Sequence, residues 1–187
     1  LIAKKYNAKT TVYRHLVQLG TGHAIMCAED SLEGPSIIAY ADTMIQGQIS
    51  IDSDVDGIIW VKKVENPSSY GVVKLDEKQN ITDLIEKPQD YISDLAVVGI
   101  YYFKDGNQLK NELQYLIDND IKDKGEYQLT NALENLKNAG KKFKTQQIDE
   151  WLDCGNQSAL LHANKRVLSF KTETNFVNPD VQIENSV

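Results

Sequence analysis

The sequence predicts a single α/β domain built on a mixed, mostly parallel β-sheet with flanking helices. Short apolar runs at 36–41, 58–61 and 95–103 are typical of strands that are buried in the middle of a sheet. Amphipathic helical patterns alternate with such runs in the second half of the chain, which favours parallel strands. A hairpin at 70–86 is a local, antiparallel exception.

Length, charge and cysteine content narrow the class of protein. The chain has 187 residues and a formal net charge of −7, so we expect one main domain and no binding of nucleic acid. Cys27 and Cys154 are too few for the disulfide framework of a small secreted domain. No apolar run approaches the roughly 18 residues that span a bilayer, and no signal-peptide pattern opens the chain. We therefore expect a cytoplasmic protein without a membrane segment.

The region before residue 35 is predicted to contain a helix end, a strand and a second helix. Residues 1–6 resemble the end of a helix, and residues 10–16 alternate and are rich in β-branched and aromatic side chains, as strands are. A turn with two glycines at 18–25 leads into an amphipathic helix that is expected to run to about Leu32. A helix start of this kind offers free backbone N–H groups to an anion or a polar ring.

The run at 36–42 is predicted to be a buried strand that ends in a carboxylate. Pro35 cannot donate to a sheet ladder, so it marks the start of the strand, and Asp42 lies at its carboxyl end. Ligands of open α/β sheets bind at that edge. Asp42 is therefore a candidate ligand, although an aspartate that only stabilises a turn is the commoner case.

The hairpin places chemically useful side chains at its open end. Antiparallel pairing of strands 70–75 and 81–86 brings Tyr70 and Gly71 beside Glu86 and the following Lys87. A glycine N–H, a carboxylate and an ammonium group can then converge on one ligand. The alternative is a solvated Glu-Lys pair at a strand end, which contributes little.

The remaining elements complete the alternation of strands and helices. A strand at 57–64 is too apolar for an edge, and a strand at 95–103 contains Gly99, a point of close backbone approach. A tight turn at 151–155 carries Asp153 and precedes a helix. The other predicted elements are helices at 108–119, 127–139 and 157–170 and an edge-like strand at 142–148.

The last residues differ in character from the rest of the chain. We expect the main domain to occupy residues 1–171, and residues 172–187 to form a linker and the start of a second domain. Aliphatic residues at 177, 181, 183 and 187 resemble the first coil of a parallel β-helix, which needs several stacked coils to bury a core. The alternative is a simple edge strand.

Seven motifs occur along the chain, namely 18–24, the strand ending in Asp42, 70–73, 86–88, 98–101, 125–130 and 151–155. Their order is the one found in sugar-phosphate nucleotidyltransferases. The chain resembles the glucose-1-phosphate uridylyl- or thymidylyltransferase branch of that family, and the order of the motifs over residues 10–170 is more specific than any one of them. The resemblance implies a Rossmann-like, GT-A-like fold. It also implies transfer of a nucleotidyl group from UTP or dTTP to a sugar 1-phosphate such as glucose 1-phosphate, giving a nucleotide sugar and pyrophosphate, with Mg²⁺ required.

The resemblance implies a role for three charged residues in catalysis. Asp42 and Asp153 match the two carboxylates that hold Mg²⁺ between the triphosphate and the sugar phosphate. Mg²⁺ is commonly held by one or two carboxylates together with substrate phosphates, so two acidic residues are sufficient. Lys87 matches the cation that contacts the sugar phosphate.

Further residues match the groups that bind the base and the sugar. Gln18 matches the side chain that reads the base edge, with help from the backbone near Gly22, and a pyrimidine is then expected. Gly71 matches a backbone N–H that meets a sugar hydroxyl, and Glu86 matches a carboxylate that accepts from sugar hydroxyls. The sugar pocket is expected to be lined by Tyr70 and Val98.

The sequence also departs from the family pattern. The glycine-rich triphosphate loop at the family's N-terminus, with its arginine and lysine, is absent, and Ala41 stands where a glycine usually precedes the metal aspartate. We therefore expect the chain alone to be inactive, although the parent protein would be active. Separately, we expect the parent protein to be a homo-oligomer. The alternatives are a non-catalytic regulatory or binding subunit and a mannose-1-phosphate guanylyltransferase, in which Gln18 would read a purine. The histidines at 15, 23 and 162 lie too far apart in sequence to predict a metal cluster.

Overall fold

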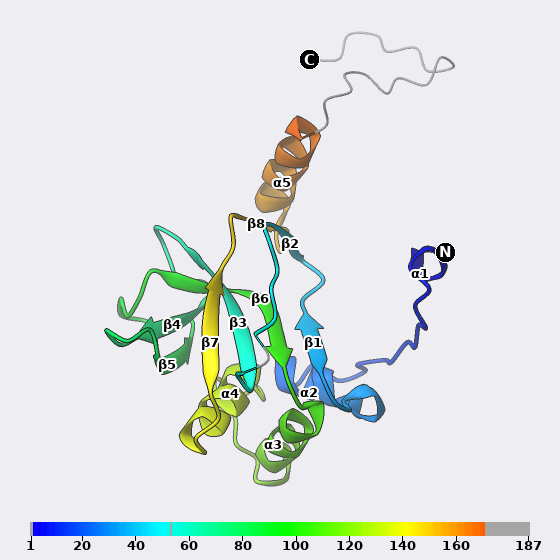
Figure 1. The fold of residues 1–187 in the computed structure, drawn as a ribbon, viewed down its shortest axis with the longest axis vertical. Helices are drawn as coiled ribbons and strands as arrows, with labels where there is room; N and C mark the ends of the chain where they lie inside the picture. Colours follow the sequence, from blue (N-terminus) through cyan, green and yellow to red (C-terminus); the bar gives the residue numbers. More distant parts are fainter. Residues whose placement is uncertain (1, 53, 171–187) are drawn as a thin grey trace.

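A six-stranded mixed sheet forms the centre of the domain (Figure 1). The computed structural model describes residues 2–52 and 54–170, so the predicted linker and β-helix start at 172–187 lie outside the described residues. Five strands lie in the order β5-β4-β6-β3-β7, and β1 pairs with the edge of β6 that β3 leaves free. The strands are β1 (Ser36–Ala39), β3 (Gly57–Lys63), β4 (Gly71–Leu75), β5 (Ile81–Glu86), β6 (Leu95–Phe103) and β7 (Phe143–Gln147).

Helices cover one face of this sheet, and a small second sheet lies against the other. On the helical face, leucines of α3 (Gly106–Asp118) and α4 (Leu129–Asn138) pack with sheet residues such as Ile59 and Val73. On the other face, Trp60 and Val98 form a smaller cluster that Trp151 borders. The second sheet pairs β2 (Thr43–Gln46) with β8 (Glu150–Asp153), and the remaining helices are α1 (Ile2–Lys5), α2 (Thr21–Met26), a 3₁₀ turn at Glu29–Ser31 and α5 (Gln157–Ser169).

The sheet is mixed, as predicted, but the expectation that it is mostly parallel is wrong. β6 runs antiparallel to β1, β3 and β4, β4 runs antiparallel to β5, and among the described pairs only β3 and β7 are parallel. An apolar run shows that a strand is buried but does not show the direction of its neighbours. The helical connection through α3 and α4 joins β6 to β7, which are not adjacent in the sheet, so it creates no parallel pair between them.

Two predictions before residue 35 are also wrong. Residues 10–16 form no strand, and Val12 and Leu16 are more than four-fifths exposed. Strand propensity has little effect where no neighbouring strand supplies pairing and packing. The helix expected to reach Leu32 ends at Met26, because Ala28 leaves helical geometry (φ −110°, ψ 25°), and only a 3₁₀ turn follows.

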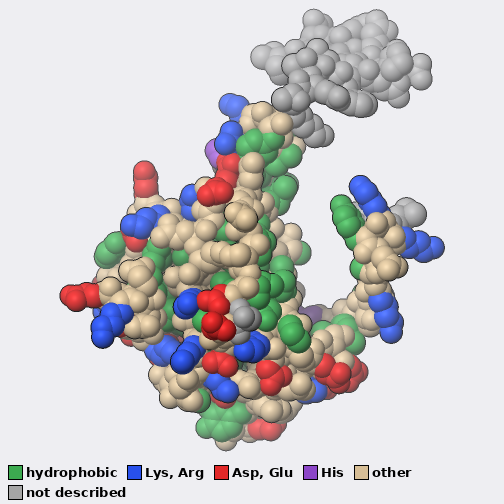
Figure 2. All heavy atoms as spheres, in the orientation of Figure 1, with side chains coloured by type: hydrophobic (Ala, Val, Ile, Leu, Met, Phe, Trp, Pro, Cys, Tyr) green, Lys and Arg blue, Asp and Glu red, His purple; other side chains and the backbone are tan. Residues whose placement is uncertain are grey.

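Charge is mixed on the face of the described residues shown in Figure 2, where Lys and Arg side chains lie among Asp and Glu side chains. Within residues 2–52 and 54–170, no helix has the length and apolar character needed to cross a membrane.

A bulge in β6 positions the loop that carries Asp42. Between Ile59 and Val61 of β3 the pairing register shifts, so that Trp60 stands opposite several residues of β6, among them Gly99 at φ 80°. The Gly99 carbonyl accepts a hydrogen bond from the Tyr40 amide (2.9 Å). A Cβ at Gly99 would lie 2.8 Å from the Tyr40 ring, which confirms the predicted close approach. Bulges commonly re-aim the chain beside functional sites.

Candidate active site

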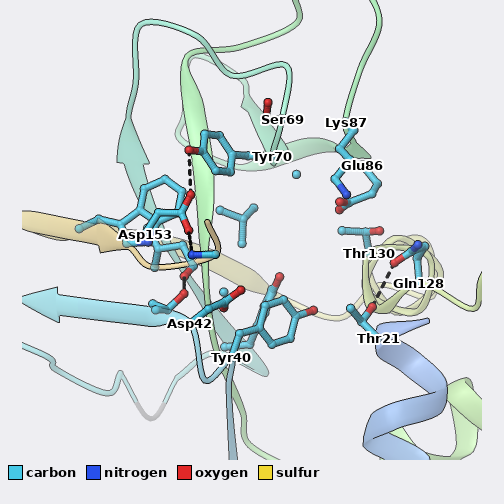
Figure 3. A pocket seen from close by; sticks show the side chains of 18 of the residues that line it. Thr21, Tyr40, Asp42, Ser69, Tyr70, Glu86, Lys87, Gln128, Thr130 and Asp153 are labelled. Carbon is cyan, nitrogen blue, oxygen red and sulfur yellow. Dashed lines mark hydrogen bonds between the residues drawn. The ribbon is translucent and has the colours of Figure 1, made fainter. Parts of the chain in front are cut away.

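A cavity of about 470 Å³ opens where β1 and β4 leave part of β6 uncovered (Figure 3). Because β3 occupies one edge of β6, β1 and β4 must share the other edge. β1 pairs with residues 100–103 and β4 with Ala96, so the residues between them face the gap. These residues, Val97, Val98 and Gly99, form part of the cavity wall.

The pairing of β2 with β8 brings two distant carboxylates together. Thr43 lies opposite Asp153 in this pair, and the Cys154 amide donates to the Asp42 carbonyl (2.8 Å). The Gly155 amide donates to Asp153 Oδ1 (2.8 Å). A Cβ at Gly155 would lie 3.1 Å from Asp153 Oδ1 and 3.4 Å from Asp42 Oδ2. The two carboxylates therefore flank one small space that a side chain at position 155 would fill.

Tyr70 fixes one of these carboxylates. Its hydroxyl donates to Asp153 Oδ2 (3.2 Å), and its ring lies edge-on to Trp151 with ring centroids 4.8 Å apart. Partial burial, followed by the nearby charge of Asp153, raises the pKa of the Tyr70 phenol. The phenol therefore keeps its proton and acts as a donor. Tyr70 was predicted to line the sugar pocket, and it lines the same cavity as Asp42 and Asp153.

The open end of the hairpin forms the opposite wall, as its strand pairing predicted. Gly71 pairs with Glu86, and a Cβ at Gly71 would lie 2.9 Å from Glu86 Oε2. Lys87 follows at a positive φ of 45°, and Lys124 Nζ donates to the carbonyls of Glu86 and Lys87 (2.9 Å each). In Figure 3 the Glu86 and Lys87 side chains lie across the cavity from Asp42 and Asp153.

The environment of Glu86 predicts a pH dependence of stability. Burial raises the pKa of the Glu86 carboxyl above its ordinary value of 4.5, and the Lys87 and Lys124 charges offset this only in part. The folded protein thus retains this proton to a higher pH than the unfolded chain. The free energy of unfolding is therefore expected to fall as pH rises from 4.5 through the raised pKa.

Glu86→Gln removes this ionisation and tests the prediction. Over that pH window the wild type is expected to lose stability relative to the variant, as measured by urea unfolding at a series of pH values. A constant difference between the two proteins, or one of opposite sign, would contradict the assignment.

The structure adds neutral residues to the cavity that the sequence reasoning did not single out. Thr21 Oγ1 donates to Gln128 Oε1 (3.1 Å) and accepts from the Leu129 amide (3.0 Å), which joins α2 to the start of α4. Thr130 Oγ1 is buried and has no hydrogen-bond partner within the described part of the chain. The only sequence signal for Gln128 and Thr130 was the motif at 125–130, because these residues carry no charge.

Two predicted binding residues do not line this cavity. Gln18 is exposed on the irregular segment before α2. The Gly22 amide donates to the Tyr127 carbonyl (2.8 Å), so it is not free for a ligand. The predicted role of Gln18 in reading the base remains a prediction.

A second hollow of about 570 Å³ continues from the cavity toward α2. The two share Thr21, Tyr40 and Asp42, and the second hollow also includes Ile25 and Ala41. Asp42 therefore lies between the polar cavity at the hairpin and the more apolar second hollow against α2. This arrangement can hold one ligand group on each side of the Asp42 carboxylate.

The sequence profile described as nucleotidyl transferase matches residues 10–169. The chain therefore belongs to the nucleotidyl transferase family, which confirms the family resemblance noted from the motifs.

Individual relatives agree with this assignment. The bifunctional protein GlmU of Methanococcus aeolicus is 31% identical over 172 residues, which cover 90% of this chain and 41% of that protein. The glucose-1-phosphate thymidylyltransferase of Streptomyces antibioticus is 30% identical over 173 residues, or 88% of this chain and 47% of that enzyme. The chain thus spans less than half the length of these two curated relatives.

A solved structure confirms the Rossmann-like architecture. UDP-glucose pyrophosphorylase complexed with UDP-glucose has a TM-score of 0.71 and 23% identity to this chain, and the match covers 88% of this chain and 68% of that one.

Proposed function

We propose that the protein containing this chain transfers a nucleotidyl group from UTP or dTTP to a sugar 1-phosphate such as glucose 1-phosphate. The observation that carries the proposal is that two adjacent carboxylates face a glutamate and a lysine of the hairpin across one cavity. Asp42 and Asp153 occupy one wall, and Glu86 and Lys87 occupy the other. The similarity to a glucose-1-phosphate thymidylyltransferase supports the choice of a pyrimidine nucleotide and of glucose 1-phosphate.

The donor set at the carboxylates suits Mg²⁺. Hard carboxylate oxygens are the ligands that Mg²⁺ prefers, and Asp42 Oδ2 and Asp153 Oδ1 both border the small space beside Gly155. When bound there, Mg²⁺ would neutralise charge on the substrate phosphates. Tyr70 and the Gly155 amide already hold Asp153 in place, so this carboxylate is oriented before any ligand binds.

The remaining work of the site is to bring two anions together. The sugar phosphate oxygen attacks the α-phosphorus in line and pyrophosphate leaves, so catalysis depends on positioning and on charge stabilisation. Glu86 accepts from sugar hydroxyls beside the Gly71 amide, and Lys87 donates to the sugar phosphate. The hollow against α2 would then receive the nucleoside, with Ile25 and Ala41 in contact with its apolar faces.

The proposal is tested by pyrophosphate release from the full-length protein with Mg²⁺ and glucose 1-phosphate. Turnover with UTP or dTTP supports it. Faster turnover with GTP and mannose 1-phosphate would favour a guanylyltransferase. Calorimetric binding of nucleotide and Mg²⁺ without any turnover would instead identify a regulatory or binding subunit.

Lys87→Ala provides a local test of the sugar-phosphate wall. Loss of one charge-assisted hydrogen bond is expected to raise KM for the sugar 1-phosphate about 10- to 100-fold and to leave KM for the nucleotide nearly unchanged. Lys74→Ala is the matched control, because Lys74 lies on the same hairpin and is exposed, and its ammonium group forms a surface ion pair with Asp83. Equal effects of both variants would remove Lys87 from the site.

A further inference from the structure

Two histidines and a cysteine lie close together on one side of α2. Their spacing in the sequence did not predict this cluster. One ring nitrogen each of His15 and His23 and the Cys27 sulfur all lie within 4.8 Å of one another. Within the described residues this is the one group of three or more His, Cys, Asp or Glu side chains that is close enough to hold an ion. It lies outside the residues that line the proposed active site.

The helix places two of the three groups on one face. His23 lies within α2, and Cys27 is its C-cap in helical geometry, with the Cys27 amide donating to the His23 carbonyl (3.2 Å). Residues four apart are neighbours on a helix surface. The Gly22 amide bonds to the Tyr127 carbonyl, and Met26 is buried in the core, so α2 is held firmly.

The third group comes from the irregular segment before α2. His15 Nε2 lies 2.9 Å from His23 Nδ1, so the two ring nitrogens point at one another. Two neutral imidazoles can make this contact only if one nitrogen carries the shared proton and the other offers its lone pair. If the donating ring instead carries its proton on its other nitrogen, both facing nitrogens offer a lone pair, and a metal ion between them would receive one from each ring.

The dimensions are close to those of a tetrahedral zinc site. Zn–N bonds of about 2.0 Å and Zn–S bonds of about 2.3 Å separate neighbouring ligand atoms by roughly 3.3–3.6 Å. The observed nitrogen separation of 2.9 Å is shorter than this, and the longest separation in the cluster is at most 4.8 Å. Binding of an ion therefore requires the two rings to separate slightly and the thiol to approach them, by rotation of these side chains. All three side chains are partly buried, so the cluster is shielded but can still be reached by an ion.

We propose that His15, His23 and Cys27 form a binding site for one Zn²⁺ ion. Imidazole and thiolate ligands select borderline and soft transition metals, whereas Mg²⁺ and Ca²⁺ require oxygen ligands. Three protein ligands leave a fourth position for water. The ion would fasten the segment that contains His15 to α2, whose first residue, Thr21, lines the cavity.

The test is calorimetric titration of the metal-stripped full chain with Zn²⁺, in excess Mg²⁺ to occupy carboxylate sites. Wild-type protein is expected to bind one Zn²⁺ per chain. His15→Ala and Cys27→Ser are each expected to weaken binding at least tenfold. The matched controls His162→Ala and Cys154→Ser, which alter the remaining histidine and cysteine, are expected to leave it unchanged.

Cobalt provides an independent readout of the ligands. Co²⁺ bound at this site should give a thiolate-to-metal charge-transfer band that disappears in Cys27→Ser and persists in Cys154→Ser. Circular dichroism checks that each variant is folded. Absence of binding by the wild type, equal binding by Cys27→Ser, or loss of binding in Asp42→Asn with the histidines intact would overturn the proposal. None of these outcomes depends on nucleotidyl transfer.

Discussion

Replacing Asp42 or Asp153 with asparagine is expected to lower the turnover of the full-length protein at least about 100-fold, the usual cost of removing a main charge-stabilising group. Asparagine keeps the size of the side chain but removes the negative charge that would hold Mg²⁺ beside Gly155. Steady-state assays at several Mg²⁺ concentrations measure the effect, and raised Mg²⁺ is expected to restore part of the activity.

A double variant sharpens this test. If both carboxylates hold one ion, Asp42→Asn combined with Asp153→Asn is expected to be little worse than either change alone, because groups that act as a unit are not additive. Asp83→Asn is the matched control, since Asp83 is a partly exposed aspartate of β5 that pairs with Lys74. Near-normal activity of Asp42→Asn, with unfolding like that of the wild type, would refute the assignment of this carboxylate.

Gly99→Ala is expected to lower the free energy of unfolding by about 3 kcal/mol, combining a strained backbone with overpacking. The glycine has φ 80°, and a Cβ there would lie 2.8 Å from the Tyr40 ring and 3.2 Å from Thr43 Oγ1. Thr43 Oγ1 also donates to the Val98 carbonyl (2.8 Å), so the chain beside the bulge cannot easily move away.

A second glycine separates the two contributions. Gly140 has nearly the same backbone angle (φ 85°), but a Cβ there would meet nothing within 4 Å. Gly140→Ala is therefore expected to cost only about 1 kcal/mol, the backbone part alone. Urea unfolding of both variants measures the difference, and equal losses would show that the contact with Tyr40 is not tight.

Much of the fold could be predicted from apolar patterns because burial leaves a direct trace in sequence. The predicted strand at 95–103 coincides with β6, the strand at 57–64 is the interior strand β3, and the edge-like strand at 142–148 is β7 at the end of the sheet order. Strand direction could not be predicted in the same way. The small β2–β8 sheet was also missed, because its strands have four residues each and mixed polarity.

The charged part of the candidate site could be predicted and the neutral part could not. Asp42, Glu86 and Lys87 were predicted at strand ends and Asp153 in a turn before a helix, and the structure brings all four to one cavity. The position of Thr130 depends on how α4 packs beside the hairpin, which no local pattern specifies. The histidine–cysteine cluster was missed for a related reason: His15 lies on a segment without regular structure, so spacing could not relate it to His23.

The β2–β8 pairing also bears on the order in which the molecule folds. This pair joins residues 43–46 to residues 150–153, so forming it closes most of the chain into a loop, whereas the β4–β5 hairpin forms from near neighbours. Contacts between distant segments carry the larger loss of chain entropy and form slowly. We therefore expect the two carboxylates to meet late in folding, after the hairpin that carries Glu86 has formed.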